Sequence, residues 1–493
     1  MNRWLQKEPL DRLSLSAIAI LTVVIAGLML TGQVCGSSCP FLRVAPRVTS
    51  FTWDQQIIGA QDTAFILTFD RAMERQSVED NLVIEPPLPG KLSWSGRRLA
   101  YTLLGVAPYG QSYELSLSNA QSAYSDYTLK NFTSQFRTRD RAFAYIGSQG
   151  DEEGRLMLWN FTQQSNKEGF TPLILTPPNL NVVDFEFYPD GNKILFSAAP
   201  RGSDNSFQDL KIFSVNIPTT GERTPKIEVI LDNRAYQNYN FGLSPDGKSL
   251  VVQRVSRENP AEFGLWIVRD AQPPQPLNIS GGEFAIAPDG STLAVAQGEG
   301  IALLPLEPDA EPLDFLPKFG RLLNFSADGS AAALIDFHAE DPERRFTRSV
   351  VYANNQGITQ ELLSTDGSIK DCQFSPRGTR LYCLITELIE GEDVYQEQPF
   401  FTAIDLETGT VTPLLALPFH QDIQISLAPD GLGILFDQIT TGLVSTNEND
   451  AVTESGELVT ESSLWLLILP TADEPDAQLE QIPLAGFHPE WLP

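Results

Sequence analysis

Residues able to carry special chemistry are few in this chain of 493 residues, which has four cysteines and three histidines. The sequence contains no Gly-x-Ser-x-Gly elbow, no His-Glu-x-x-His helix and no Cys-x-x-Cys pair. Such patterns place a nucleophile, a zinc ion or a redox pair. Nucleophilic and zinc-dependent hydrolysis therefore have no recognisable machinery here, and we predict no catalytic, cofactor-binding or metal-binding residue.

Two of the cysteines lie on either side of one predicted β-turn. Cys372 precedes Phe374 by two residues and Cys383 follows Leu381 by two. Residues two apart on a strand share a face, so both sulfurs are expected inside the sheet, opposite each other or one step diagonal. The sequence is compatible with a Cys372–Cys383 disulfide and with a pair of buried free thiols, and both predictions are kept. Cys35 and Cys39 could form a bridge or be ordinary cysteines near a membrane.

One charged run offers the best metal candidate, because it combines several carboxylates with an imidazole: Asp336, His338, Glu340, Asp341 and Glu343. It lacks the glycine-punctuated spacing of a calcium loop. We therefore interpret it as a solvated loop between two strands. His420 and His488 stand alone, and each is interpreted as a turn or packing residue.

The elements that must position these residues come from a repeat. Six times an apolar run stops at Pro-Asp-Gly or a near variant and resumes, and the repeated glycines are Gly191, Gly247, Gly290, Gly329, Gly378 and Gly431. They lie 39 to 56 residues apart, which is typical of four-stranded propeller blades. Pro, Asp and Gly suit successive positions of a tight turn, and Gly takes the position with positive φ. Each repeat therefore predicts a β-hairpin.

We assign each hairpin to the second and third strands of a blade. Residues 142–147 and 155–160 then form the last two strands of an incomplete blade, and residues 481–484 and 486–493 form the first two. Joining these halves in one sheet would close the ring. The prediction is an all-β chain with a seven-bladed propeller over residues 139–493, and six blades as the alternative.

The pattern Phe-x-x-Ser-Pro-Asp-Gly, seen at Phe241 to Gly247, resembles the WD-like repeats of TolB-type periplasmic propellers. The resemblance covers about residues 142–493. It implies a propeller fold, but that family includes assembly factors, peptidase-associated propellers and lyases, so it implies no single activity.

Residues 47–138 have a different rhythm of short alternating strands and polar turns, which predicts a small β-sandwich. The run from Thr68 to Met73 and the run from Pro108 to Leu115 resemble the bacterial Ig-like domain named after the S-layer protein SbsA. That resemblance implies a spacer or adhesive module on an exported protein, with no catalytic residues.

The N-terminal region predicts a membrane anchor. Residues 13–34 carry no charge and are long enough to cross a bilayer. Arg3, Lys7 and Arg12 precede them, which places residues 1–12 in the cytoplasm and the rest of the chain, after a linker at 35–46, on the extracytoplasmic side. A cleaved signal peptide followed by secretion is the alternative.

A net charge of −29 repels nucleic acid, so nucleic-acid binding is excluded. Acidic residues gather in the long connections that follow the predicted hairpins, above all between Asp437 and Ser463. We expect a membrane-anchored interaction or assembly scaffold that docks a protein or cell-wall partner. The alternative is a propeller enzyme, a lyase, hydrolase or lactonase, with its site in the central channel. The strands assigned to the channel supply mainly apolar residues, Ile227, Val229, Leu303 and Leu414, and therefore favour the scaffold.

Overall fold

The computed structural model describes two compact units. It describes residues 18, 20–23, 45–164, 171–203, 208–218, 225–269, 272–280, 282–298, 300–308, 311–389, 396–418, 422–442, 451–453, 457–471 and 474–493. The first unit contains Asp62–Thr138 and the residues up to Ile58, and the second contains Gly59–Gln61 and Arg139–Pro493. In the described residues no helix is both long enough and apolar enough to cross a bilayer. Most of the predicted anchor at 13–34, together with residues 1–12, Cys35 and Cys39, lies outside them.

The first unit is a β-sandwich of two four-stranded sheets around one core. One sheet has the order β1 (Val48–Phe51), β3 (Ala64–Phe69), β6 (Arg98–Leu103) and β5 (Gly90–Ser95). The other has the order β2 (Ile57–Ile58), β10 (Phe132–Thr138), β7 (Ser112–Leu117) and β4 (Leu82–Glu85). A short hairpin, β8 (Gln121–Ser122) with β9 (Ser125–Thr128), and one helix, α2 (Arg75–Asn81), complete it.

Period-two burial produces this sandwich. Tyr113, Leu115 and Leu117 alternate along β7 with exposed or half-buried residues, and they share the core with Phe65 and Phe69 of β3 on the facing sheet. Alternation of this kind fixes which face of each strand is buried. The Glu74 carboxylate accepts the backbone N–H groups of Gln76 and Ser77 and so caps the start of α2.

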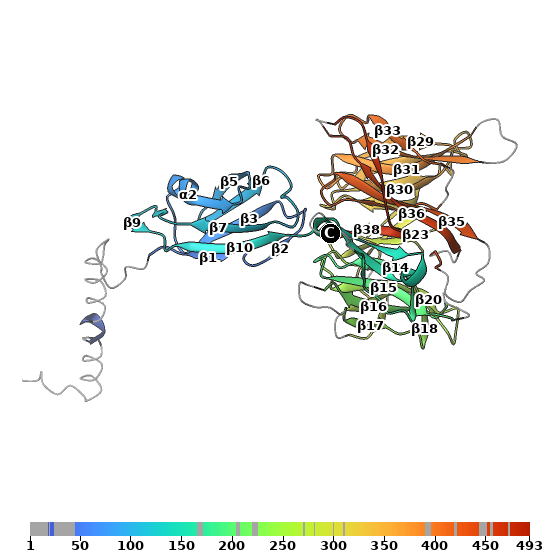
Figure 1. Ribbon diagram of the computed structural model, residues 1–493, viewed down its shortest axis with the longest axis horizontal. Coiled ribbons are helices and arrows are strands. Elements are labelled where there is room, and N and C mark those ends of the chain that lie inside the picture. The colour runs from blue at the N-terminus through green and yellow to red at the C-terminus, as the bar shows by residue number, and fades with distance from the viewer. Residues whose placement is uncertain are drawn as a thin grey trace, which may run out of the picture. The chain divides into compact units, whose positions relative to one another are not determined.

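The second unit is a β-propeller of antiparallel four-stranded sheets (Figure 1). The described residues contain seven of these sheets. In order along the chain they are β14 (Leu180–Phe187), β15 (Lys193–Pro200), β16 (Lys211–Asn216), β17 (Ile227–Leu231); β18 (Tyr236–Leu243), β19 (Ser249–Ser256), β20 (Phe263–Arg269), β21 (Gln275–Pro276); β22 (Phe284–Ile286), β23 (Thr292–Gln297), β24 (Gly300–Pro305), β25 (Asp314–Leu316); β26 (Phe319–Phe325), β27 (Ala331–Asp336), β28 (Arg348–Asn354), β29 (Thr359–Thr365); β30 (Ile369–Phe374), β31 (Arg380–Leu388), β32 (Glu397–Asp405), β33 (Val411–Ala416); β34 (Ile425–Leu427), β35 (Gly433–Gly442), β36 (Leu458–Ile468), β37 (Gln478–Ile482); and the split sheet β38 (Gly486–Trp491), β11 (Ala142–Gly147), β12 (Leu156–Asn160), β13 (Leu173–Ile174). Two short helices, η2 (Gly150–Glu152) and α3 (Phe161–Gln164), flank β12.

Each of the six repeated turns joins the first and second strands of a sheet. The turn glycines have φ between 61° and 71°, a left-handed conformation that only glycine adopts without steric cost. At Gly247 the backbone N–H donates to the carbonyl of Ser244 at 2.7 Å, and the Asp246 carboxylate accepts the backbone N–H of Lys248 at 3.1 Å. The six glycines are therefore structural.

The predicted strand order within a blade is wrong by one strand. The hairpins form the first and second strands, because the strand before each turn is an edge strand whose only sheet neighbour is the strand after the turn. Five of these six edge strands contribute residues to the central cavity. The runs assigned to the channel therefore lie elsewhere: Ile227 and Val229 are on β17, Leu303 is on β24 and Leu414 is on β33, the third or fourth strands of their sheets.

The ring closes through one C-terminal strand and three N-terminal strands, so the prediction of two strands from each end is wrong. β38 pairs with β11, with Phe143 opposite Trp491 and Ala144 opposite Glu490. Gln478–Ile482 instead forms β37 and pairs with the free edge of β36, so it completes the preceding sheet. Only β38 is left to fill the inner position of the split sheet. Figure 1 shows the marked C-terminus close to the teal strands that begin this unit.

Candidate functional site

The first strands of the sheets surround the propeller channel, and alternate side chains of each strand share a face. The fifth residue before each turn glycine takes an equivalent position on its first strand, and Glu490 of β38 takes the same position in the split sheet. The seven residues at this position are Glu186, Gly242, Ala285, Asn324, Gln373, Ser426 and Glu490. They form what we term the inner ring.

Polar side chains of the inner ring form hydrogen bonds with the first strand of the following sheet. Glu186 Oε2 accepts the backbone N–H of Leu243 at 2.9 Å, and Gln373 Oε1 accepts that of Leu427 at 2.8 Å. Ser426 Oγ accepts the backbone N–H of Trp491 at 3.1 Å, and Glu490 accepts that of Phe187. β30, β34, β38, β14 and β18 are thereby linked in sequence. Contacts between β18 and β22, β22 and β26, and β26 and β30 complete the circle.

A cavity of about 450 Å³ occupies this channel. Its lining residues come from six of the seven first strands and the approach to β34: Asp184, Phe185, Glu186, Phe241, Asn324, Gln373, Gln424, Ile425, Ser426, His488, Pro489 and Glu490. Three of the lining side chains are carboxylates, one is an imidazole, and none is a lysine or arginine. The cavity therefore favours neutral or cationic polar molecules over anions.

Glu186 and Glu490 form an acid pair in the wall of the cavity. Burial raises the pKa of Glu186 from its ordinary value of 4.5 to about 7, although the hydrogen bond from Leu243 opposes the shift. Burial, and then the nearby Glu186 carboxylate, raise the pKa of Glu490 well above 4.5. Two close carboxylates cannot both ionise cheaply in a desolvated site. The pair therefore holds a proton near neutral pH.

His488 is held beside the acid pair by the backbone of β38. It has φ of 53°, a left-handed conformation that is unusual for a side chain with a Cβ. Its backbone N–H donates to Asp437 Oδ2 at 2.7 Å, while Asp437 Oδ1 accepts the backbone N–H of Gln424 at 2.7 Å. The imidazole Nε2 lies 3.7 Å from Asp184 Oδ1, and the ring centroid lies 4.9 Å from that of Phe185.

Asp437 itself belongs to β35 and is only 1% exposed, so it does not begin a solvated loop as the sequence suggested. Burial raises its pKa from 3.8 to about 7. Much of the acidic connection that follows, residues 443–450 and 454–456, lies outside the described residues.

Sequence reasoning missed this site because it assigned the wrong strands to the channel. A usable signal was present: Glu186 and Glu490 each stand between two bulky apolar or ring-bearing neighbours, Phe185 and Phe187 for one, Pro489 and Trp491 for the other. A carboxylate at a position that other repeats fill with Gly, Ala or an amide indicates a special role within the repeat.

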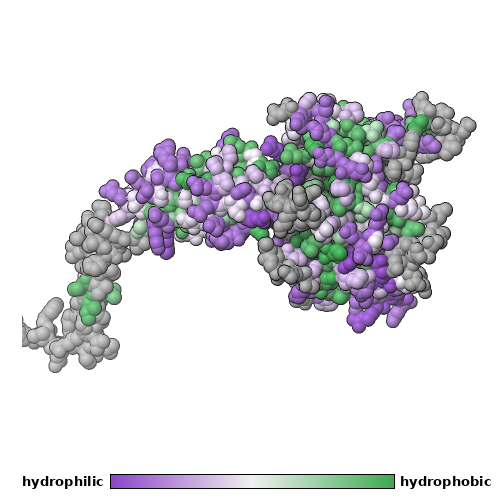
Figure 2. All heavy atoms as spheres, viewed as in Figure 1, coloured by the Kyte–Doolittle hydropathy of each residue, from purple (hydrophilic) through white to green (hydrophobic). Residues whose placement is uncertain are grey.

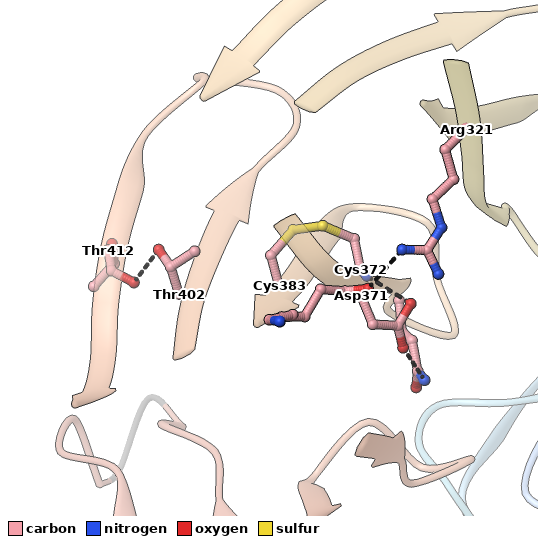
Figure 3. The surroundings of a disulfide bond; sticks show 8 residues. Arg321, Asp371, Cys372, Cys383, Thr402 and Thr412 are labelled. Atoms are coloured by element: carbon pink, nitrogen blue, oxygen red, sulfur yellow. Dashed lines mark hydrogen bonds between the residues drawn. A yellow bond between two sulfur atoms is a disulfide. The ribbon is translucent and has the colours of Figure 1, made fainter. Parts of the chain in front are cut away.

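The cysteines of the predicted hairpin form a disulfide (Figure 3). Cys372 lies directly opposite Cys383, both are fully buried, and the sulfurs are 2.04 Å apart. The bridge joins β30 to β31. Next to it, Asp371 accepts the backbone N–H of Cys372 at 2.8 Å and the side-chain amide of Gln373 at 2.9 Å, and burial raises the pKa of Asp371. The disulfide thus links β30, which contributes Gln373 to the channel, covalently to its neighbour β31.

The charged run from Asp336 to Glu343 forms a loop network. His338 Nε2 lies 2.8 Å from Ser349 Oγ, and Lys318 Nζ lies 2.8 Å from Asp336 Oδ2. Glu340, Asp341 and Glu343 are exposed, whereas Asp336 and His338 are buried, so the prediction of a solvated loop is correct only for the second half of the run. No group of three metal-binding side chains that could hold an ion occurs in the described part of the chain. Ser349 is fully buried, so its place beside His338 offers no nucleophile to a substrate. His420 lies outside the described residues.

Gly242 to Ser249 matches the phosphate-loop pattern Gly-x-x-x-x-Gly-Lys-Ser. A phosphate loop requires a strand before it and a helix after it. Here the segment is the turn between β18 and β19, and Lys248 Nζ lies 3.3 Å from the Asp246 carboxylate. The match is therefore a consequence of turn chemistry.

No family model matches the chain, and no curated protein matches it. Solved structures do. Oligogalacturonate lyase from Vibrio parahaemolyticus is 12% identical, covering 74% of this chain and 100% of its own, with a TM-score of 0.45. A periplasmic gluconolactonase from Pseudomonas aeruginosa is 15% identical, with coverages of 71% and 98% and a TM-score of 0.45. A protein assigned as TolB from Agrobacterium tumefaciens is 14% identical, with coverages of 56% and 90% and a TM-score of 0.34. At these values the likeness adds nothing about activity, and the propeller fold rests on the strand pairing.

Proposed function

We propose that the propeller binds a small polar molecule, neutral or cationic, in its central channel and transforms it by proton transfer, as a hydrolase, lactonase or lyase. The observation that carries this proposal is the convergence of Asp184, Glu186, Glu490 and His488 on one cavity of about 450 Å³. That size falls within the range of small-molecule sites.

The acid pair supplies the first half of such chemistry. With a pKa near the working pH, a buried carboxyl can donate a proton to a departing oxygen and take it back from water. Glu186 has that property, and the pKa of the neighbouring Glu490 carboxyl is also raised. The imidazole of His488, oriented by Asp184, is the partner that accepts a proton from water or from the substrate. Phe241 and Ile425 supply apolar wall on which a ring could rest.

The test is a set of uncharged and charged probes with the full chain. A neutral lactone, a neutral oligosaccharide, a linear diamine and gluconate are each assayed for binding by calorimetry and for turnover. We expect at least one neutral or cationic probe to bind and gluconate not to bind. The double variant Glu186→Gln with Glu490→Gln should lose turnover by roughly 100-fold or more, the usual scale for removing an acid or base catalyst.

The matched control is Glu228→Gln, because Glu228 is an exposed carboxylate on β17 that pairs with Lys226. It should leave binding and turnover unchanged. Binding of gluconate in preference to the neutral probes, or full turnover by the double variant, would contradict the proposal.

Docking of a protein or cell-wall partner is the second candidate. Phe337 and Phe346 favour it, because they are 41% and 70% exposed in the loop between β27 and β28. On the face in view in Figure 2, however, hydrophobic and hydrophilic residues are interspersed. Affinity purification with the full chain and with Phe337→Ala plus Phe346→Ala tests it. A partner that both proteins retain equally would exclude this loop as the docking surface.

The placement of the chain is also a proposal. We propose a single-pass protein anchored by residues 13–34, with the sandwich as an Ig-like spacer and the closed ring as a seven-bladed propeller outside the cytoplasm. The Cys372–Cys383 disulfide supports an oxidising compartment. Protease added to the outer side of intact membranes should digest the propeller, and full protection would contradict this orientation.

A further inference from the structure

The closing strand β38 differs from every other first strand in how it is held. The other six first strands are joined to their second strands by a tight turn. β38 instead pairs with β11, which lies far earlier in the chain, and no turn connects the two strands. The noncovalent contacts of β38 therefore decide whether the ring is closed.

Carboxylates supply contacts on both sides of β38. On the side of the preceding sheet, Asp437 accepts the backbone N–H of His488 at 2.7 Å. On the side of the following sheet, Glu490 accepts the backbone N–H of Phe187 and lies next to Glu186, which itself reaches on to β18. The neutral contacts are Ser426 Oγ with the backbone N–H of Trp491 at 3.1 Å and the backbone N–H of Leu492 with the carbonyl of Ala142 at 2.9 Å.

We term the contact of β38 with the first strands on either side of it the seam. Charged groups from each neighbouring element lie at the seam. β14 contributes Asp184 and Glu186, β38 itself contributes His488 and Glu490, and β35 contributes Asp437. Asp422, which precedes β34, interacts with Glu457 and Lys370. At the end of β38, Arg141 pairs with Asp430, and Arg139 donates to the carbonyl of Pro493. In the part of the chain that the structure describes, no Lys or Arg forms an ion pair with Glu186, Glu490 or Asp437. The carboxyl groups of Glu186, Glu490 and Asp437 therefore have no Lys or Arg partner when they ionise.

We propose that β38 is a pH-sensitive latch, closed while Glu186, Glu490 and Asp437 are protonated and loosened when they ionise. This inference does not depend on any ligand, so it stands or falls separately from the proposed function.

The direction follows from linkage. Burial raises the pKa of Glu186 from 4.5 and of Asp437 from 3.8, each to about 7, and raises that of Glu490 as well. The closed state therefore binds more protons than the open state between about pH 4 and pH 7. Stability of the closed state is greatest below the ordinary pKa values and is lost as pH rises through the raised ones. Above them, ionised and desolvated carboxylates repel across the seam.

Hydrogen exchange of the full chain, read by mass spectrometry as protection factors, tests the latch. The protection of the peptide that contains β38 is measured at pH 5.5 and pH 8. It is compared with that of the peptide that contains β30, a strand that the disulfide joins covalently to its neighbour. We expect the protection of β38 to fall by about tenfold or more over this range, since one raised pKa unit corresponds to tenfold. The protection of β30 should change much less.

Two variants identify the groups. Glu490→Gln keeps the acceptor oxygen and cannot ionise, so it should reduce the pH dependence at β38, and Asp437→Asn provides the same test from the other side if Glu490→Gln does not fold. Glu228→Gln, exposed on β17, should leave the dependence intact. Equal loss of protection at β38 and β30, no loss at either, or a β38 response that persists in both Glu490→Gln and Asp437→Asn would overturn the latch.

Discussion

The channel wall formed by β38 and β14 carries Glu490 and Glu186 in the inner ring, whereas the wall formed by β18 and β22 carries Gly242 and Ala285 there. All four are first strands of four-stranded antiparallel sheets, and β14, β18 and β22 are each followed by the same type of turn. The fold therefore requires little of this position, and the polar side chains of one wall reflect what that wall does. In a propeller built from repeats, departures from the repeat locate function better than the repeat itself.

The largest expected effect tests whether the wall of β38 also closes the ring. Trp491→Ala removes a side chain that is 4% exposed and packs against Phe143 and Phe161. We expect it to lower the free energy of unfolding of the propeller by about 3–5 kcal/mol, measured by denaturant titration. Tyr124→Ala, at an 89% exposed residue of the sandwich, should change it by less than about 0.5 kcal/mol. A small effect at Trp491 would show that β38 contributes little to closure.

The second prediction concerns the wall of β30, which a covalent bond supports. The double variant Cys372→Ala with Cys383→Ala opens a loop whose ends are 11 residues apart. We expect a loss of about 2–3 kcal/mol in the free energy of unfolding, because the bridge restricts the unfolded chain. Reduction of the wild-type protein should give a similar loss. Equal midpoints for oxidised, reduced and double-variant proteins would contradict this.

The third prediction separates the charged wall from the neutral wall by pH. Glu186→Gln should raise the free energy of unfolding at pH 8 by about 2 kcal/mol and change it little at pH 5. At pH 5 the wild-type Glu186 is already protonated, whereas at pH 8 ionisation of its buried carboxyl costs stability. Urea titrations at the two pH values measure it. A variant that is no more stable than the wild type at pH 8 would show that Glu186 ionises freely.

The smallest expected effect comes from a substitution that introduces a hydrogen-bond acceptor into the wall formed by β18 and β22. Ala285→Gln places an amide where Gln373 already binds the next strand, so it should reach the backbone N–H of Phe325 on β26 and add about 1 kcal/mol. Ala285→Leu is the control, since it adds bulk without an acceptor. If both substitutions destabilise the protein equally, the neutral wall has no room for the inner-ring contact.

Turn chemistry made much of the fold predictable from the sequence. The glycines from Gly191 to Gly431 adopt the positive φ that the Pro-Asp-Gly pattern requires, and the alternation around Phe241 and Leu250 places one strand on either side of each turn. The opposed positions of Cys372 and Cys383 followed from the same alternation.

Radial position was not predictable in the same way. A hairpin looks alike whether it forms the first and second strands or the second and third, because both pairs bury alternate residues. Because of that ambiguity, the prediction assigned β17 and β33 to the channel, where β14 and β38 in fact lie, and the predicted channel was apolar. The raised pKa values of Glu186 and Glu490 depend on burial by strands more than 50 residues away, which no local pattern reports.

Infrared difference spectroscopy of the carboxyl band tests the central claim most directly. The spectrum of the wild-type protein minus that of Glu186→Gln with Glu490→Gln is followed from pH 4 to pH 9 and isolates the two channel carboxyls. The channel site predicts that the protonated carboxyl band persists to pH 6 and disappears with a midpoint at or above about 7. Loss of the whole band near pH 4.5 would show two ordinary, solvated carboxylates and would contradict the site.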